Sequence, residues 1–306
     1  MKAVMGLDGG GTKTLLRLTD LQKHVLVEEI GLSSNICSCG RDTARENLCS
    51  LIHRALANAP EGTEVEAACI GSAGLLTGED AAFYEEILRG ETGCSRALAR
   101  DDSVTALYAN LEDQPGLSLT AGTGSICLGK NSRDDFARVG GWGHLFSDEG
   151  SAYAIAAQAL RRSLWGVDGR GPATALFGLL LDAFGCTSAE DLTAALYRDR
   201  EDKQRIASLS PLVDKAAEEG DAVAASILAD AARDLLAMAE AVIRRLNLSD
   251  EPFTVYLSGS VLLKSQPVRE AFTRELTASY PQASVLPGRQ DAAWGAVYLA
   301  LRQLSA

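Results

Sequence analysis

Short apolar runs alternate with a helical stretch along the first third of the chain. Four runs have the length and the aliphatic content of strands, at Lys2 to Leu7, Leu15 to Leu18, Val25 to Ile30 and Val65 to Ile70. Between the third and the fourth, Thr43 to Ala57 has apolar residues at helical spacing. This order is typical of an α/β domain.

A turn rich in glycine and threonine stands between two strands at two places. The first is Asp8 to Lys13, and the second is Ala121 to Ser125 within a strand, loop and strand that begin at Leu117. The repetition indicates a duplicated core. From Ser151 the chain is mostly helical, including Asp221 to Leu246, before the segment FTVYL returns to a strand.

The chain is long enough for two domains. At 306 residues, 46% of them hydrophobic, two cores are expected. The polar turn Asp113-Gln114-Pro115-Gly116 predicts a boundary between domains at 1–114 and 115–288. A last helix is predicted at Ala292 to Leu301, and its small residues would let it pack closely on another element.

Charge and termini exclude several classes of function. The net charge is -12, with 41 acidic and 29 basic residues, which argues against binding nucleic acid or anionic lipid. The N-terminus MKAVMGLDGGGTKTLL has neither a signal peptide nor a membrane span, so a cytoplasmic protein is expected.

Cysteines and histidines predict no disulfide framework and no structural metal site. The seven cysteines are scattered, and residues such as Cys69 and Cys127 stand in apolar context. Cys37 and Cys39 have only Cys49 near them, and the three histidines make no ligand spacing, whereas a closed zinc site needs four ligands.

The segment GLDGGGTKT suggests a phosphate-binding hairpin. Its glycines allow successive N–H groups to wrap around an anionic oxygen. Asp8 at the strand end can hold Mg²⁺, often through water, while Thr12 and Lys13 reach the transferring phosphoryl group. A β-turn without a ligand is the alternative. The segment does not match a Walker A loop, because a strand rather than a helix is predicted after it.

Two further loops have a similar character. Ala121-Gly122-Thr123-Gly124-Ser125 would clasp the β and γ phosphates from the opposite side, or would form an ordinary hairpin turn. Leu257-Ser258-Gly259-Ser260-Val261 follows a strand and opens a helix, which would let small residues lie against an adenosine. Both loops are predicted to serve the nucleotide.

Asp101 and Asp102 follow the short run Arg96 to Arg100. One of the two carboxylates is therefore expected at the carboxyl end of a strand, where α/β crevices form. A kinase that acts on a hydroxyl needs such a group to orient the hydroxyl and to take its proton. The alternative is a cap for a helix over Ser103 to Leu111.

The segment GGWGHLFSDEGSAY contains a glycine-flanked tryptophan, Trp142, and two acidic residues, Asp148 and Glu149. A tryptophan beside a carboxylate is suited to form the wall of a sugar site. The alternative is structural, since acidic residues in the first turn of a helix over Ala152 to Leu164 would favour its dipole.

Taken in this order, the segments resemble the BadF/BadG/BcrA/BcrD ATPase family of the acetate and sugar kinase, Hsp70 and actin superfamily, over essentially the whole chain. DGGGTKT is similar to the first phosphate motif, AGTGS to the second, and LSGSV to the adenosine motif. GGWGHLFSDEGSAY is similar to a signature of the branch that contains N-acetylglucosamine kinases.

The resemblance implies an α/β fold of two actin-like, ribonuclease H-like lobes with an interlobe ATP and sugar cleft. It also implies that residues 289–306 return to the first lobe, and homodimers are frequent among the kinases it resembles. The implied nucleotide-binding residues are Asp8, Gly10, Gly11, Thr12, Lys13, Gly122, Thr123, Gly124, Gly259 and Ser260. Asp8 is the implied residue for Mg²⁺.

The implied reaction is transfer of a phosphoryl group from ATP to the 6-hydroxyl of an amino sugar, most simply N-acetylglucosamine. Asp102 is the implied base, and the implied sugar residues are Asn35, Asp102, Ser125, Gly141, Trp142 and Asp148. Ile126 departs from the polar residue that such kinases tend to carry there, which puts the acetamido contact in doubt.

Other acceptors and other classes of function stay open. Glucosamine and N-acetylmuramic acid are alternative acceptors. The rival enzyme is an ATPase that activates a dehydratase by electron transfer, which needs cluster-binding cysteines in a motif that the sequence lacks. A binding module, such as an actin-like protein or a sugar-responsive repressor, is the remaining alternative, although neither terminus carries a DNA-binding extension.

Overall fold

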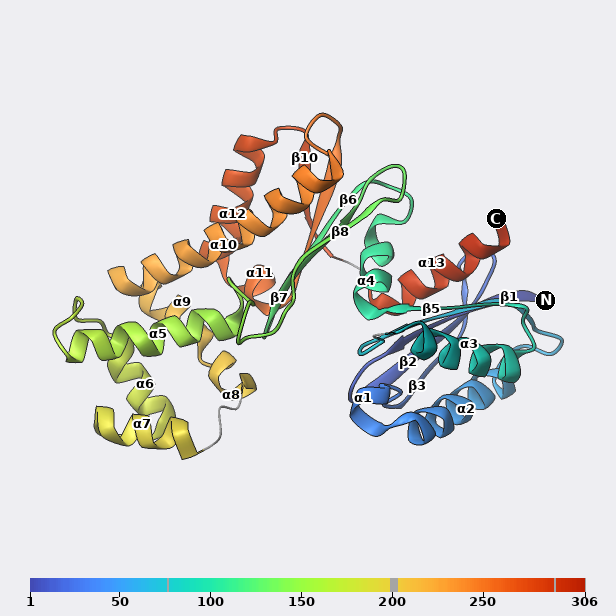
Figure 1. Cartoon of the computed structure of the whole chain (residues 1–306), viewed down its shortest axis with the longest axis horizontal. Helices are drawn as coiled ribbons and strands as arrows, with labels where there is room; N and C mark the ends of the chain where they lie inside the picture. The colour runs from blue at the N-terminus through green and yellow to red at the C-terminus, as the bar shows by residue number, and fades with distance from the viewer. Residues whose placement is uncertain (76, 199–202, 289, 306) are drawn as a thin grey trace. The chain divides into compact units, whose positions relative to one another are not determined.

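The computed structural model describes residues 1–75, 77–198, 203–288 and 290–305. The chain forms two compact units, one made of Met1–Asp113 and Arg289–Ala306 and the other of Gln114–Gly288. Each unit contains one five-stranded sheet with helices packed on it (Figure 1). The predicted α/β class is confirmed.

The first unit is built on a sheet with strand order β3-β2-β1-β4-β5. Its elements, in chain order, are β1 (Lys2–Gly9), β2 (Lys13–Asp20), β3 (Val25–Leu32), α1 (Ile36–Cys39), α2 (Arg41–Ala57), β4 (Glu64–Ser72), α3 (Gly78–Thr92), β5 (Arg96–Asp101), α4 (Asp102–Leu111) and α13 (Ala292–Ser305). The first three strands are antiparallel neighbours, whereas β1, β4 and β5 run parallel.

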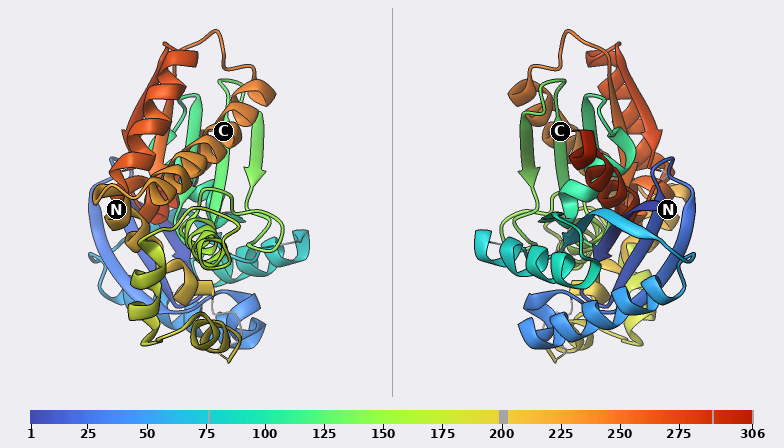
Figure 2. Two further views of the ribbon diagram at one scale, coloured as in Figure 1. Left: turned by 90° about the vertical axis from the view of Figure 1, so that its left-hand side faces the viewer. Right: turned by 90° about the vertical axis from the view of Figure 1, so that its right-hand side faces the viewer.

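Alternate residues of β1 belong to different layers of the core. Met5 and Leu7 are buried in a cluster with α2 and α3, whereas Val4 is buried with residues of α13. Figure 1 and Figure 2 show the corresponding helices on opposite faces of this sheet. Because side chains alternate along a strand, Asp8 lies on the same face as Val4, the face that α13 covers.

Two glycines let α13 pack directly on its neighbours. A Cβ on Gly6 in β1 would lie 2.4 Å from the backbone nitrogen of Val297. A Cβ on Gly295 in α13 would lie 1.7 Å from the carbonyl oxygen of Thr105 in α4. Neither position has room for a larger residue, so the close packing predicted for this small-residue helix is confirmed.

The second unit repeats the same sheet. Its elements, in chain order, are β6 (Gly116–Ala121), β7 (Ser125–Lys130), β8 (Phe136–Gly140), α5 (Ala152–Val167), α6 (Leu176–Phe184), α7 (Ala189–Arg198), α8 (Lys203–Ala207), α9 (Ser210–Glu218), α10 (Ala222–Leu246), β9 (Phe253–Ser258), α11 (Ser260–Lys264), α12 (Gln266–Ser279) and β10 (Ala283–Pro287). Its strand order is β8-β7-β6-β9-β10, with β6, β7 and β8 antiparallel and β6, β9 and β10 parallel. Position by position this is the arrangement of the first sheet, so the predicted duplication is confirmed.

Helix α10 is the longest element of the second core. It begins after Asp221, whose carboxylate accepts a hydrogen bond from the N–H of Ala224 at 2.9 Å. It ends at Asn247, which adopts a left-handed φ of 56°. Its buried face packs on the sheet and on α12. The left view of Figure 2 shows α10 in orange beside α12 in red-orange.

One predicted helix start was wrong by one residue and another was confirmed, and both bear on the site. Helix α4 begins at Asp102 rather than at Ser103, because Asp101 is its N-cap. Helix α5 begins at Ala152 with Ser151 as its N-cap, so it has no acidic residue in its first turn. The dipole explanation for Asp148 and Glu149 therefore does not hold.

All seven cysteines lie within the described residues and are free. His24 pairs with Asp20, His53 with Glu91, and His144 lies edge-on to Tyr153. Among the described residues, no group of three or more histidine, cysteine or acidic side chains is placed to hold a metal ion. No helix within the described ranges is long and apolar enough to cross a membrane.

Candidate active site

Three strand ends meet at one edge of the first sheet. Asp8 in β1 pairs in register with Gly71 in β4, and Ser72 in β4 pairs with Asp101 in β5. Since these strands are parallel, their carboxyl ends lie at the same edge, which is where α/β sheets bind ligands. Asp102 follows immediately as the first residue of α4.

Asp101 and Asp102 have different surroundings. The Asp101 carboxylate accepts a hydrogen bond from the Ser103 N–H at 3.1 Å and another from the Ser103 hydroxyl, so Asp101 is the helix cap. Burial, then the negative charges of Asp101 and Asp8, raises the pKa of Asp102 from 3.8 to about 6. A carboxyl group with a pKa close to the working pH is suited to take a proton from a substrate.

Asp8 is half-buried on the face that α13 covers. Burial raises the pKa of this carboxyl group, the charge of Asp291 raises it further, and Lys13 lowers it. Asp291 precedes α13 and is held by Arg17, whose Nη1 donates to its Oδ1 at 2.7 Å. Arg17 also lies over the ring of Trp294, 4.6 Å from its centroid. The unit therefore concentrates negative charge around Asp8, which a cation would neutralise.

The glycine hairpin between β1 and β2 is closed by a hydrogen bond from the Gly10 N–H to the carbonyl oxygen of Lys13 at 3.0 Å. Gly11, Thr12 and Lys13 are exposed at its tip. The Ser33 hydroxyl donates to the carbonyl oxygen of Gly10 at 3.0 Å. The loop after β3 is therefore fastened to the hairpin, and the structure brings Asn35 next to the predicted phosphate loop.

Asn35 is buried as the N-cap of α1. Its Oδ1 accepts a hydrogen bond from the Cys37 N–H at 2.8 Å. Its Nδ2 faces the hairpin, since a Cβ on Gly11 would lie 4.0 Å from it. Because the oxygen is committed to the cap, the amide group can offer a ligand its N–H donors rather than its acceptor.

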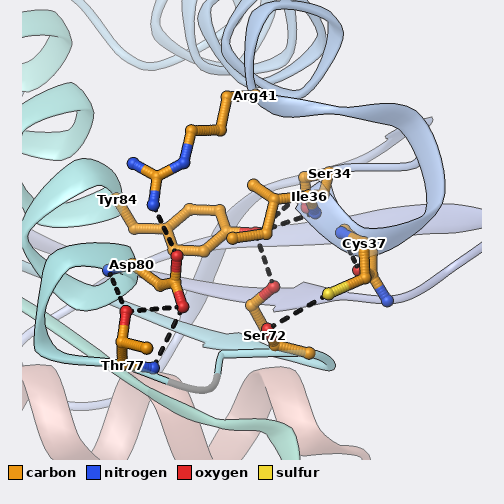
Figure 3. Close-up of polar contacts among 10 residues, drawn as sticks. Ser34, Ile36, Cys37, Arg41, Ser72, Thr77, Asp80 and Tyr84 are labelled. Carbon is orange, nitrogen blue, oxygen red and sulfur yellow. Dashed lines mark hydrogen bonds and ion pairs between the residues drawn. The ribbon is translucent and has the colours of Figure 1, made fainter.

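Tyr84 of α3 fixes the loop that carries Asn35 (Figure 3). Its hydroxyl donates to the carbonyl oxygen of Ser34 at 2.7 Å and accepts hydrogen bonds from Ser72 Oγ at 2.9 Å and from the Ile36 N–H at 3.3 Å. Tyr84 is fully buried, so all of these bonds form away from water. One phenol therefore joins the residues on either side of Asn35 to the end of β4.

A second set of contacts in Figure 3 holds the helix that presents Tyr84. Thr77 and Asp80 form a capping box at the start of α3, and the Asp80 carboxylate accepts a hydrogen bond from Arg41 Nη2 at 2.6 Å. Arg41 is the first residue of α2. The starts of α2 and α3 are thereby joined beside the Asn35 loop.

Replacement of Tyr84 by phenylalanine is expected to raise the KM for the sugar about threefold to tenfold while leaving the KM for ATP unchanged. The ring still fills its site, but the loop on both sides of Asn35 loses hydrogen bonds worth roughly 0.5 to 1.5 kcal/mol each. Steady-state kinetics with each substrate varied would measure the change. Tyr108→Phe, which removes a buried phenol on the other face of the sheet, is the matched control, and an equal effect in both variants would contradict a role for the Asn35 loop.

In the second unit, the loop from Ala121 to Ser125 lies against Gly259. The Gly122 N–H donates to the carbonyl oxygen of Gly124 at 2.9 Å, and the Ala152 N–H at the start of α5 donates to the carbonyl oxygen of Gly122 at 2.8 Å. A Cβ on Gly259, whose φ is 84°, would lie 2.3 Å from the carbonyl oxygen of Ala121. The structure thus brings together the predicted second phosphate motif and the predicted adenosine motif. Thr123 and Ser260 are exposed beside them.

The turn that follows β8 presents Trp142. Arg138 Nη2 donates to the carbonyl oxygen of Gly141 at 2.7 Å, and its guanidinium lies 5.1 Å from the centroid of the Trp142 ring. Trp142 is 70% exposed. A Cβ on Gly141 would lie 2.8 Å from Cδ1 of Ile126. Ile126, which stands where similar kinases tend to carry a polar residue, therefore packs directly under this turn.

Asp148 is the most confined of the predicted sugar residues. Its side chain is 4% exposed, and its backbone is left-handed with a φ of 69°. The carboxylate accepts a hydrogen bond from the Ser125 N–H at 3.1 Å and one from Lys203 Nζ at 2.8 Å. A Cβ on Gly124 would lie 2.8 Å from both carboxylate oxygens. The absence of a side chain at Gly124 therefore leaves the space that the Asp148 carboxylate occupies.

Ser125 supports this arrangement from within. Its hydroxyl donates to the carbonyl oxygen of Glu149 at 2.7 Å, and the residue is 3% exposed. Ser125 therefore holds the segment that carries Asp148, and direct contact between its side chain and a sugar stays a prediction.

Four residues that contact the predicted site residues were not found from the sequence: Tyr84, Arg138, Lys203 and Asp291. Tyr84 and Lys203 give no signal, because each is an ordinary helix residue far along the chain from its partner. Arg138 is an ordinary strand residue three positions before Gly141, and no motif distinguishes it. Asp291 could have been noticed as the acidic residue directly before the predicted last helix.

A duplicated five-stranded core with a glycine-rich hairpin in each half, and carboxylates at strand ends, defines a nucleotide-using protein of the actin-like class. The chain belongs to the BadF/BadG/BcrA/BcrD ATPase family, whose family model matches residues 5–300.

Relatives over the full length are sugar kinases by name. The chain is 35% identical to an N-acetylmuramic acid/N-acetylglucosamine kinase of Clostridium acetobutylicum, with 98% of each protein covered. It is 30% identical to an N-acetyl-D-glucosamine kinase of Dictyostelium discoideum, with 97% of each covered. A solved structure from Chromobacterium violaceum, provisionally named an N-acetylglucosamine kinase, matches with a TM-score of 0.71 at 26% identity, covering 98% of this chain and 99% of that one.

Proposed function

We propose that this chain is an ATP-dependent kinase that transfers the γ-phosphoryl group of ATP to the 6-hydroxyl of an amino sugar, most simply N-acetylglucosamine. The observation that carries the proposal is Asp102. It is a half-buried carboxyl group directly after the end of a parallel strand, its pKa is raised to about 6, and Asp101 rather than Asp102 caps the helix. Full-length similarity to kinases of this substrate class supports the same activity.

In this mechanism Asp102 hydrogen-bonds the acceptor hydroxyl and takes its proton as the oxygen attacks. A new bond forms between that oxygen and the γ-phosphorus, the bond from the γ-phosphorus to the bridging oxygen breaks, and ADP leaves. Water would compete with the sugar hydroxyl, so Asp102 must orient the acceptor as well as accept the proton.

The nucleotide is assigned to the glycine loops. Gly11, Thr12 and Lys13 are exposed at the tip of the first hairpin, which the Gly10 N–H closes, and Thr123 is exposed at the tip of the second, between Gly122 and Gly124. Gly259 and Ser260, which lie beside the second hairpin, are assigned to the adenosine. Successive N–H groups in such turns suit phosphate oxygens.

Mg²⁺ fits the oxygen ligand and the excess negative charge around Asp8, whose pKa is raised by burial and by Asp291. When bound, the ion would neutralise charge on the phosphates. Asp8 is the residue assigned to hold it, through water, because Mg²⁺ usually keeps several waters and takes one or two carboxylates.

The sugar is assigned to Asn35, Asp102, Asp148 and the turn at Gly141 and Trp142. Asn35 offers N–H donors, Asp148 accepts from ring hydroxyls, and the exposed face of Trp142 covers the ring. Ile126, packed under Gly141, offers an apolar contact to an acetamido methyl group. Such a contact discriminates only about tenfold to a few hundredfold.

A panel of acceptors tests the proposal. We expect kcat/KM for N-acetylglucosamine or N-acetylmuramic acid to exceed that for glucose at least tenfold, because a site built for hydrogen bonds rejects analogues that leave its polar groups unpaired. Phosphorylation measured by coupled ADP release would give the values. Preference for glucose would refute the amino sugar, and ATP turnover that no sugar stimulates would favour the dehydratase activator instead.

Replacement of Asp148 by asparagine is expected to raise the sugar KM at least about tenfold, because one charged acceptor for ring hydroxyls is lost. Asparagine keeps the shape and tolerates the left-handed backbone, so the fold should be retained. Kinetics with the sugar varied would measure the effect. Asp134→Asn is the matched control, since Asp134 is also left-handed and paired with a lysine, Lys130; a sugar KM raised equally by both substitutions would count against the assignment.

A further inference from the structure

Lys203, the first residue of α8, places a cation at the carboxylate assigned to the sugar. Its Nζ lies 2.8 Å from Oδ2 of Asp148, and its side chain is 30% exposed while that of Asp148 is 4% exposed. Asp148 in turn lies against Gly124 and the Ser125 N–H. Of the two paired side chains, Lys203 is therefore the one that solvent or a ligand can reach.

The ion pair leaves part of the ammonium for a ligand. Among the described residues, the hydrogen bond of Lys203 Nζ is the one to Asp148. An ammonium has further N–H donors, and the exposed part of the side chain keeps them accessible. A carboxylate on the acceptor accepts from such a donor in a charge-assisted hydrogen bond, which is stronger than one to a neutral group.

Distance decides which acceptor such a cation can reach. A sugar oxygen that is hydrogen-bonded to the Asp148 carboxylate lies roughly 3 to 6 Å from Nζ, as hydrogen-bond lengths of about 2.8 Å on each side require. N-acetylmuramic acid is N-acetylglucosamine with a lactic acid joined as an ether to the hydroxyl oxygen of one ring carbon. Its carboxylate carbon is two bonds from that oxygen, so the carboxylate is within reach of the ammonium when the neighbouring hydroxyl is bound by Asp148.

We propose that Lys203 is a binding residue for a carboxylate on the acceptor and thereby sets the preference of this enzyme between N-acetylmuramic acid and N-acetylglucosamine. The inference rests on the proposed kinase function and on the assignment of Asp148 to the sugar.

Lys203→Met tests the inference, because methionine keeps the length of the side chain and removes the charge. We expect kcat/KM for N-acetylmuramic acid to fall about tenfold or more relative to that for N-acetylglucosamine, since a charge-assisted hydrogen bond is lost with one substrate only. Lys203→Arg should restore the ratio. Lys215→Met, which removes an exposed lysine paired with Glu219, is the control and should leave the ratio unchanged.

A purely structural role for Lys203 would lower both values of kcat/KM together and leave their ratio unchanged, which would overturn the inference. Wild-type enzyme that phosphorylates N-acetylglucosamine but not N-acetylmuramic acid would overturn it as well, while leaving the kinase function standing. Failure with both sugars would instead reject the proposed function. The wild-type enzyme allows a test without substitutions. Raising the salt concentration should lower kcat/KM for N-acetylmuramic acid more than kcat/KM for N-acetylglucosamine, because salt screens the charge on Lys203. An equal decrease for both sugars would contradict the inference.

Discussion

Replacement of Asp102 by asparagine is expected to lower kcat by roughly two to four orders of magnitude, because the group that takes the proton of the acceptor is lost. Asp101→Asn is the matched control, because asparagine also caps helices well. Rapid-quench or coupled measurements of kcat would compare the two variants. An inactive Asp101→Asn with an active Asp102→Asn would reverse the assignment.

The pH dependence gives this prediction a second readout. The pKa of Asp102 is raised to about 6, so kcat/KM should rise as pH increases through about 6, where the base becomes ionised. The charge of Asp101 contributes to that shift. In Asp101→Asn the midpoint should therefore move to lower pH, whereas a cap alone would leave it unchanged.

If Asp102→Asn were inactive because it is unfolded, its melting temperature would be lower than that of the wild type. A carboxyl group whose pKa is raised on folding stabilises the protein below its unfolded pKa of 3.8, and this contribution is lost as pH rises through about 6. At pH 7 the charge on Asp102 opposes folding, so Asp102→Asn should melt no lower than the wild type. An inactive variant with an equal or higher Tm would exclude unfolding as the cause.

Replacement of Asp8 by alanine is expected to abolish most turnover, by at least about 10²-fold, because it removes the carboxylate proposed to hold Mg²⁺ at the phosphates. It should also abolish the dependence of nucleotide binding on Mg²⁺. Titration calorimetry with ADP, with and without Mg²⁺, would measure this directly. Glu66→Ala is the control, since Glu66 is a carboxylate of β4 in the same sheet that pairs with Lys2.

The melting temperature of Asp8→Ala should show whether the loss of activity comes from lost ion binding or from unfolding. Burial and the charge of Asp291 raise the pKa of Asp8, so its ionised form opposes folding at neutral pH. Asp8→Ala should therefore keep its Tm within a few degrees, and Mg²⁺ with nucleotide should raise the Tm of the wild type alone. A folded and fully active Asp8→Ala enzyme would contradict the assignment.

The architecture could be predicted because strands, turns and the small-residue helix each show a pattern within a short stretch of sequence. Runs of strand length located eight of the ten strands in the described residues, in part or in full, and missed β8 and β10. The repeated glycine and threonine turn indicated the duplication that the two sheets confirm. Small residues in the last helix predicted its close packing, which Gly6 and Gly295 make visible. Periodicity and turn chemistry are short-range properties, so a single sequence contains them.

The division of labour between Asp101 and Asp102 could be predicted only in part. The sequence placed two carboxylates at a strand end, but the choice of Asp102 rested on the family resemblance alone, and the strand itself ends at Asp101. In the structure the difference arises from the helix: Asp101 caps α4 and Asp102 is its first residue. Helix boundaries depend on which side chain reaches the free N–H groups, and adjacent aspartates compete for that position.

The partners of the candidate sugar residues could not be predicted. Asn35 depends on Tyr84, which is 49 residues further along the chain, and Asp148 on Lys203, which is 55 residues away. Contacts over such separations are set by how helices pack on a sheet, and one sequence has no local pattern that records them. The acidic pair at Asp148 and Glu149 was ambiguous as well, until the structure showed Ser151 as the N-cap of α5 and no acidic residue in its first turn.

Transfer of label from γ-labelled ATP is the measurement that tests the kinase assignment most directly. Purified protein would be incubated with the labelled nucleotide, Mg²⁺ and N-acetylglucosamine, and the products separated and identified by phosphorus NMR. The assignment predicts that the label appears on the 6-hydroxyl of the sugar, with release of one ADP for each sugar phosphate, and that Asp102→Asn blocks this transfer. Label found only in inorganic phosphate, at a rate that the sugar does not change, would contradict it.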